Sequence, residues 1–188
     1  MKNVIKNYLS EASDIISEQA SNFPDIKTFE IDCSQLKEFL KEDIRYSEEF
    51  KELFEKLMPI KVPCLYWYRV ISDNTSTEII NSFKVYRDYA ERDRNVPALN
   101  SDNSIDHNSR ILYVGKVKGG IYGRVIQHLG CFSSAKTQGL QLFYWAQKIG
   151  LKLELNVLEF DNKMADILPI VEFAVAKNKL HPLIGKHK

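Results

Sequence analysis

The sequence lacks the features of secreted, membrane-spanning and disulfide-stabilised proteins. It has only three cysteines, widely separated and without a CxxC pair, which predicts neither a disulfide framework nor a zinc knuckle. No segment approaches the roughly 20 apolar residues of a membrane span, and the first residues contain no apolar run of a signal peptide. We therefore expect a cytoplasmic protein that does not associate with membranes.

Glycine and proline are also scarce, with eight and six residues among 188. This scarcity, together with 44% hydrophobic and 27% charged residues, excludes collagen-like and wholly disordered chains. The length suits one ordinary domain, or one domain with an appended helical segment. We expect a globular protein with a substantial hydrophobic core.

The net charge is only +1, but the charged residues are unevenly distributed along the chain. Residues 1–109 carry 14 Lys and Arg against 20 Asp and Glu, whereas residues 110–188 carry 12 against 5. A basic segment of this kind favours a polyanionic partner such as nucleic acid. The alternative is that its lysines only solvate the surfaces of helices.

Hydrophobic periodicity predicts an α+β fold. The N-terminal part contains helical patterns at 2–20 and 34–57, and an extended stretch at 28–31 joins them. Strand patterns follow at 64–71, 110–117 and 151–157, with helical patterns at 76–94, 121–129, 137–149 and 166–180. We expect a small three-stranded antiparallel sheet flanked by helices in residues 61–188, preceded by a helical N-terminal extension in residues 1–60.

A polar pair stands on the helix expected at 121–129. Arg124 and His128 are four residues apart, so both side chains project from one side of this helix. The planar guanidinium of arginine suits a phosphate oxygen, and histidine can move protons near neutral pH. The pair favours a phosphate-directed site, and the alternative is a solvated helix edge.

Glu172 is unusual because its neighbours on the last expected helix are almost all apolar. An ionised carboxylate that is buried without a partner costs several kcal/mol, so we expect Glu172 to pair with a cation or to bind a metal. A single carboxylate suits a well-hydrated Mg²⁺ or Mn²⁺ whose shell is completed by substrate phosphate. A salt bridge with Arg124 or Lys116 is the alternative, and the two interpretations are compatible.

Tyr66 and Tyr113 place phenols on strands that should be neighbours. A tyrosine with a pKa of about 10 is only about 0.1% ionised at pH 7, so its use as a base faces a deficit of about 4 kcal/mol unless another group helps to remove its proton. His128 is the natural helper. Each tyrosine taken alone can equally be an aromatic that packs in the sheet.

In this order, these residues resemble the motifs of the GIY-YIG nuclease superfamily, which includes repair, homing and restriction endonucleases. Leu65-Tyr66 looks like the end of the first half-motif, and Tyr113-Val114-Gly115 looks like the second. Residues 121–129 are similar to the catalytic helix of the family, and Glu172 and Pro182 follow in the family's order. The resemblance covers roughly residues 64–185.

The resemblance implies a GIY-YIG-like fold and a metal-dependent endonuclease that hydrolyses phosphodiester bonds of double-stranded DNA. It implies that a tyrosine, poised by the histidine and the lysine, deprotonates the attacking water. The arginine would steady the phosphate, and the glutamate would hold Mg²⁺ or Mn²⁺. The implied catalytic residues are Tyr66, Tyr113, Lys116, Arg124, His128 and Glu172, with Glu172 as the metal ligand.

A segment at about 72–109 separates the two half-motifs and reads as an insertion in the nuclease domain. Its arginines are candidate DNA contacts, and a structural flap is the alternative. The candidate DNA-binding residues are Arg87, Arg92, Arg94 and, beyond the insertion, Lys118.

Small size and the absence of a recognisable zinc finger or helix-turn-helix favour a restriction-type enzyme. One alternative is a structure-specific DNA repair or recombination nuclease. Another is a catalytically degenerate protein that only binds nucleic acid, because Gly185 stands where the family usually has an asparagine. Cleavage of both strands with one active site per chain calls for a homodimer or for successive nicking.

Overall fold

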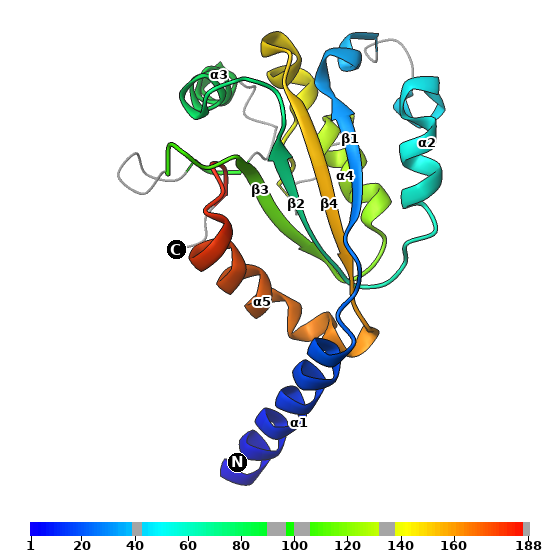
Figure 1. Ribbon diagram of the computed structural model, residues 1–188, viewed down its shortest axis with the longest axis vertical. Coiled ribbons are helices and arrows are strands. Elements are labelled where there is room, and N and C mark those ends of the chain that lie inside the picture. Colours follow the sequence, from blue (N-terminus) through cyan, green and yellow to red (C-terminus); the bar gives the residue numbers. More distant parts are fainter. Residues whose placement is uncertain (39–42, 90–96, 100–105, 132–137, 186–188) are drawn as a thin grey trace.

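A four-stranded antiparallel sheet forms the centre of the molecule in a computed structural model of the chain (Figure 1). The structure describes residues 1–38, 43–89, 97–99, 106–131 and 138–185. The strands are β1 Lys27–Asp32, β2 Cys64–Val70, β3 Ile111–Val117 and β4 Lys152–Glu159. Their order across the sheet is β1-β4-β2-β3, so that β3 is an edge strand. The predicted α+β class is confirmed.

The prediction of three strands was wrong, because the extended stretch expected at 28–31 joins the sheet as β1. It pairs with β4 from Lys27 opposite Val157 to Asp32 opposite Lys152. β4 pairs with β2 along its other edge, and its central residues are buried. Backbone groups of a buried strand need hydrogen-bond partners on both edges, and β1 supplies them on one. The segment before residue 60 therefore contributes to the sheet as well as forming helices.

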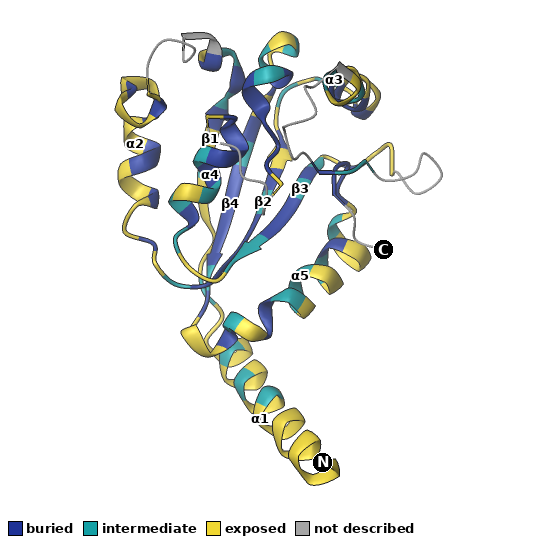
Figure 2. Cartoon of the chain, turned by 180° about the vertical axis from the view of Figure 1, so that it is seen from behind, coloured by how far each residue is buried: buried dark blue, intermediate teal, exposed yellow. Residues whose placement is uncertain are grey.

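Helices cover both faces of the sheet (Figures 1 and 2). On one face the main core joins the sheet to three helices, α2 Glu48–Leu57, α3 Ser76–Tyr89 and α4 Ile121–Leu129. On the other face a smaller core joins Leu65 and Val114 to the beginning of α5 Leu168–Val175. The first helix, α1 Lys2–Ser21, extends away from this body.

The helix predicted at 121–129 is confirmed as α4. A glycine with positive φ stands at each end, Gly120 at 74° and Gly130 at 102°, a backbone conformation that favours glycine. Ile121, Val125 and Leu129 are completely buried and hold one side of α4 against the sheet. Arg124 and His128 lie beside these residues on α4, and both bond the phenolic oxygen of Tyr66 in the sheet.

The helix expected at 137–149 is replaced by two short 3₁₀ turns, Leu142–Tyr144 and Ala146–Ile149. A regular helix is interrupted on both sides of the first turn, because Gln141 has a φ of 56° and Trp145 has a φ of −138°. The indole of Trp145 instead donates to the carbonyl oxygen of Leu140 at 2.8 Å. This fold of the chain brings residues 138–141 against α4.

The end of the chain lies along the first part of β3. The amides of Leu183 and Ile184 donate to the carbonyl oxygens of Ile111 and Leu112, at 2.9 and 3.0 Å. The amide of Gly185 donates to the carbonyl oxygen of Ala98 at 2.9 Å, which places two distant segments beside the sheet edge.

No helix within the described residues is long and apolar enough to cross a lipid bilayer.

Candidate active site

Tyr66 lies in the middle of β2, opposite Gly115 of β3, and its side chain is completely buried. The ring lies directly over Gly115. A Cβ atom at residue 115 would be 2.6 Å from Cζ of Tyr66 and 2.7 Å from Cε1 of Tyr113, closer than real Cβ contacts come. Glycine at residue 115 therefore makes room for both tyrosine rings.

His128 contacts Tyr66 from α4. Its Nε2 atom lies 2.8 Å from the phenolic oxygen of Tyr66, and its Nδ1 atom accepts a hydrogen bond from the amide of Leu140 at 3.1 Å. Complete burial, together with the charge of Arg124, lowers the pKa of His128 well below its usual value. The imidazole is therefore neutral at physiological pH.

The amide of Leu140 also determines which nitrogen of His128 carries the proton. A neutral imidazole has one N–H group, and Nδ1 must be unprotonated because it accepts a hydrogen bond. Nε2 therefore carries the hydrogen and donates it to Tyr66. This role differs from the one expected from the sequence, in which His128 helps to withdraw a proton from a tyrosine.

Arg124 joins the two tyrosines. Its Nε atom donates to the phenolic oxygen of Tyr66 at 2.9 Å, and its Nη2 atom lies 3.3 Å from that of Tyr113. Nη1 donates to the side-chain oxygen of Gln127, one turn along the same helix. The half-buried guanidinium is thus held in a fixed orientation between β2, β3 and α4.

The phenolic oxygen of Tyr66 receives two hydrogen bonds, one from Arg124 and one from His128. Burial raises the pKa of Tyr66 well above its usual value, so that this side chain keeps its own proton. Burial also raises the pKa of Tyr113, and the neighbouring phenol of Tyr66 opposes this rise, as a hydrogen bond from Tyr66 would. We infer that Tyr66 donates its proton toward the oxygen of Tyr113.

Tyr113 is the more accessible of the two tyrosines. Its pKa is raised above the usual value, because burial and the charge of Glu172 outweigh the charge of Arg124 and the hydrogen bonds from Arg124 and Tyr66, which lower it. It lines a cavity of about 380 Å³, which Glu172 and Phe173 of α5 also line. Gln138 and Gly185 are also among the residues that line this cavity.

Glu172 and Lys116 form an ion pair on the other side of β3. Lys116 follows Gly115 directly, so its side chain points to the face opposite Tyr113 and toward α5. Its Nζ atom lies 3.2 Å from Oε2 of Glu172, and the two side chains are 31% and 16% exposed. The expected salt bridge of Glu172 is therefore made with Lys116. Because β3 is an edge strand, groups on both of its faces reach one cavity.

The structure brings together all six residues of the predicted catalytic set. Four form the hydrogen-bonded cluster of Tyr66, Tyr113, Arg124 and His128, and Lys116 pairs with Glu172 at the cavity. Two of the candidate DNA-binding residues, Arg87 and Lys118, are not part of this site. Arg87 is exposed on α3, Lys118 pairs with Asp166 at 2.6 Å, and Arg92 and Arg94 lie outside the described residues.

Sequence reasoning missed three residues that hold this cluster. Gln127 binds Arg124, the amide of Leu140 binds His128, and Gly139 lets the chain approach α4 closely. A Cβ atom at residue 139 would lie 2.7 Å from the carbonyl oxygen of Gln127. Gln127 could have been found from its spacing, because residues three apart on a helix are neighbours. The role of a main-chain amide carries no signal in the sequence.

Glu172 is the carboxylate of this cavity that could hold a hydrated hard cation. Glu172 offers an anionic oxygen ligand, and the cavity has space for water and a phosphate group beside it. Within the described residues, no group of three or more His, Cys, Asp or Glu side chains could bind a metal ion. Glu172 would therefore be the main protein ligand, with water and substrate supplying the rest.

Comparisons of the chain with protein-family models, with curated proteins and with solved structures found no match.

Proposed function

We propose that this protein is a metal-dependent endonuclease that hydrolyses phosphodiester bonds of double-stranded DNA, as a restriction-type enzyme. The observation that carries the proposal is the position of Arg124. Its guanidinium bonds the oxygens of two tyrosines beside a cavity that a carboxylate also lines. The resemblance of these residues to the GIY-YIG motifs supports the same activity, and the net charge of +7 in residues 110–188 suits a polyanionic substrate.

Tyr113 is the better candidate for the general base, because it lines the cavity and Tyr66 is completely buried. Tyr113 would first release its own proton to water in the cavity. As a phenolate it would then take one proton from the attacking water, and the water oxygen would form the new bond to phosphorus. Arg124 and Tyr66 both donate hydrogen bonds to the oxygen of Tyr113 and so stabilise its negative charge. His128 would keep Tyr66 in place for this task.

Arg124 would also stabilise the phosphate as negative charge builds on its oxygens. Arginine has five N–H donors in a planar fork, which suits simultaneous contacts with tyrosine and phosphate oxygens. Glu172 would hold the metal, and Mg²⁺ or Mn²⁺ when bound supplies positive charge that stabilises the leaving 3′ oxygen. The phosphorus–oxygen bond to that 3′ oxygen breaks as the bond to water forms.

Cleavage of supercoiled and linear plasmid DNA by the purified protein tests the proposal. We expect discrete fragments with Mg²⁺ or Mn²⁺, none with EDTA, and none with Glu172→Ala or Arg124→Ala. Lys56→Ala is the matched control, because Lys56 is exposed on α2 and pairs with Glu52 of the same helix.

Two other results would replace the proposal. Cleavage confined to branched or damaged DNA in a substrate panel would indicate a structure-specific repair or recombination nuclease. Salt-sensitive DNA binding without cleavage, unchanged by Glu172→Gln, would indicate a protein that only binds nucleic acid.

A further inference from the structure

Exposed apolar side chains are concentrated at the beginning of the chain. Fourteen large hydrophobic residues are exposed within the described part of the structure, and eight of them belong to the first 26 residues. On α1 itself, five such side chains inside the helix are between 46% and 67% exposed: Val4, Ile5, Tyr8, Leu9 and Ile16. Apolar patches of this kind mark sites of interaction rather than ordinary surface.

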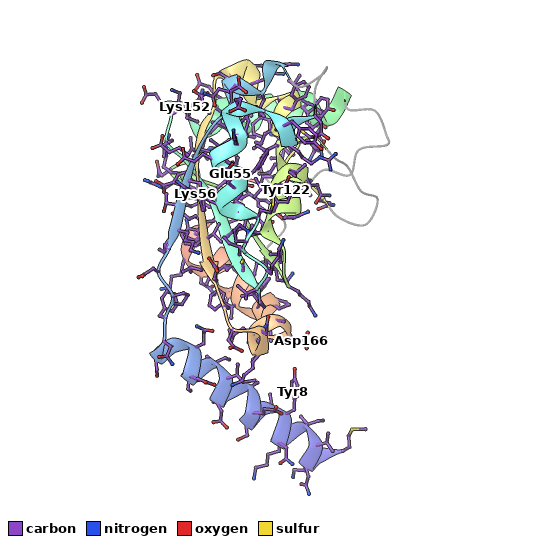
Figure 3. The ribbon with its side chains drawn as sticks, turned by 90° about the vertical axis from the view of Figure 1, so that its right-hand side faces the viewer. Tyr8, Glu55, Lys56, Tyr122, Lys152 and Asp166 are labelled. Carbon is purple, nitrogen blue, oxygen red and sulfur yellow. The ribbon has the colours of Figure 1, made fainter. Side chains whose placement is uncertain are left out.

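Only the C-terminal part of α1 contacts the body. Ala12 and Ile15 pack partly against the smaller core, and the amide of Asp161 donates to the side chain of Gln19 at 3.0 Å. The N-terminal half projects beyond the body, and Tyr8 lies on this projecting part, below Asp166 (Figure 3). An isolated helix of this length is marginally stable in water without a packing partner.

We propose that α1 is a dimerisation helix, which pairs antiparallel with α1 of a second copy of this chain. The first argument is the spacing of its apolar residues, which is symmetric about position 10 except at Leu9, which falls at the level of Glu11. An antiparallel pair places Val4 and Ile5 at the level of Ile16 and Ile15 in the second copy, and Tyr8 at the level of Ala12. Such self-complementarity is what a two-fold symmetric interface requires.

The charges of α1 also favour this orientation. Lys2 and Lys6 stand near its N-terminus, whereas Glu11, Asp14 and Glu18 follow toward its C-terminus. Antiparallel pairing places the basic end of each helix beside the acidic end of the other and opposes the two helix dipoles. Parallel pairing would instead bring the acidic ends together.

A lipid surface is a poorer partner for α1 than a second copy. Helices that bind anionic membranes carry an excess of Lys and Arg on their polar face, whereas α1 has two basic and three acidic residues.

The body also provides a place for the end of a second helix. A hollow of about 250 Å³ lies where α1 meets the body, lined in part by Ile15, Gln19 and Met164.

The first test is the mass of the full-length protein in solution, measured by light scattering and sedimentation over a range of concentrations. We expect a dimer, and we expect Tyr8→Glu to weaken self-association about tenfold or more because it buries a charge in the interface. Tyr46→Glu is the matched control, since Tyr46 is 82% exposed and lies outside α1. Circular dichroism checks that each variant is folded.

A monomeric wild type, or a dimer that Tyr8→Glu leaves intact, would overturn the proposal. Binding of a monomeric wild type to phosphatidylglycerol vesicles, lost in Tyr8→Glu, would overturn it in favour of a lipid surface. None of these measurements depends on DNA cleavage, so the pairing of α1 and the proposed activity can fail separately.

The second test distinguishes antiparallel from parallel pairing by disulfide formation. It uses a Cys131→Ser background, because the two other cysteines, Cys33 and Cys64, are buried. Leu9→Cys lies near the symmetry centre and should cross-link to its own copy. Ile5→Cys should not, because the two copies of Ile5 are about 15 Å apart along an antiparallel pair. Cross-linking of Ile5→Cys without cross-linking of Leu9→Cys would exclude the antiparallel arrangement.

Discussion

The two sides of the edge strand β3 hold the candidate site in different ways. On the α4 side, Tyr66 and His128 are completely buried, and each bonds fixed protein donors or acceptors. On the α5 side, Lys116 and Glu172 are partly exposed and are joined by one ion pair. The first side is held by several hydrogen bonds between buried groups, whereas we propose that the second exchanges its ion pair for a metal and a phosphate. Substitutions of Tyr66 and His128 should therefore affect stability, and substitutions of Lys116 and Glu172 should affect metal binding.

The largest expected effect separates the two tyrosines. Tyr113→Phe should lower the single-turnover rate of DNA cleavage by about 10²–10⁴-fold, because it removes the proposed base, with little loss of stability. Tyr66→Phe should reduce the free energy of unfolding in urea by about 1–3 kcal/mol, because it removes an acceptor from two buried donors. Equal losses of unfolding free energy in Tyr113→Phe and Tyr66→Phe would contradict this expected difference between the two tyrosines.

Gly115→Ala should destabilise the α4 side of β3 by about 1–3 kcal/mol, because the added methyl group overlaps two tyrosine rings. Gly123→Ala is the control. A Cβ atom at Gly123 would have no neighbour within 4 Å, and alanine is about 1 kcal/mol better than glycine inside a helix. Thermal and urea unfolding of both variants would measure the difference, and similar changes in the two would refute the packing argument.

The pH dependence of stability should depend on His128. Its folded-state pKa lies well below the usual 6.5, so below pH 6.5 the unfolded chain binds a proton that the folded chain does not. The free energy of unfolding should therefore fall as the pH decreases below 6.5, by up to about 1.4 kcal/mol per pH unit from this group. His128→Gln should remove that part of the slope, and the exposed His107→Gln should retain it. Urea unfolding between pH 5 and 7.5 measures the three slopes.

The smallest effect is expected for Lys116→Gln. Loss of the lysine charge beside Glu172 should lower the Mg²⁺ concentration at half-maximal cleavage by about two- to fivefold, because partly exposed ion pairs contribute little. Lys56→Gln, which changes an exposed pair with Glu52 on α2, should leave that concentration unchanged. A higher Mg²⁺ requirement in Lys116→Gln would indicate that the lysine helps to bind the substrate instead.

Local patterns in the sequence predicted much of the fold. The period of apolar residues gave the position of α4, and the aromatic and β-branched runs marked β2 and β3. Pairing of β1 with β4 could not be predicted, because it joins Lys27 to Val157 across most of the chain. The helix expected at 137–149 failed because Gln141 and Trp145 adopt backbone conformations that tertiary contacts impose.

The candidate site was predictable where its geometry is local. Spacing of four residues placed Arg124 and His128 on one side of a helix, and the structure places both against Tyr66. The protonation of His128 was not predictable, because it depends on a contact between α4 and residue 140. For the same reason, the preference for Tyr113 over Tyr66 required knowledge of which ring is buried.

The hydrogen bond from Leu140 to His128 belongs to the main chain, so every residue type except proline can make it. Residue 140 could therefore vary freely among relatives that share this site, provided that its side chain still packs, and no comparison of side chains would reveal its part in the chemistry. Among single substitutions of residue 140, only Leu140→Pro would remove the hydrogen bond to Nδ1. The imidazole of His128 could then exchange between its two tautomers. A designer who wished to convert His128 into a proton acceptor for Tyr66 would begin at that amide and leave the histidine unchanged.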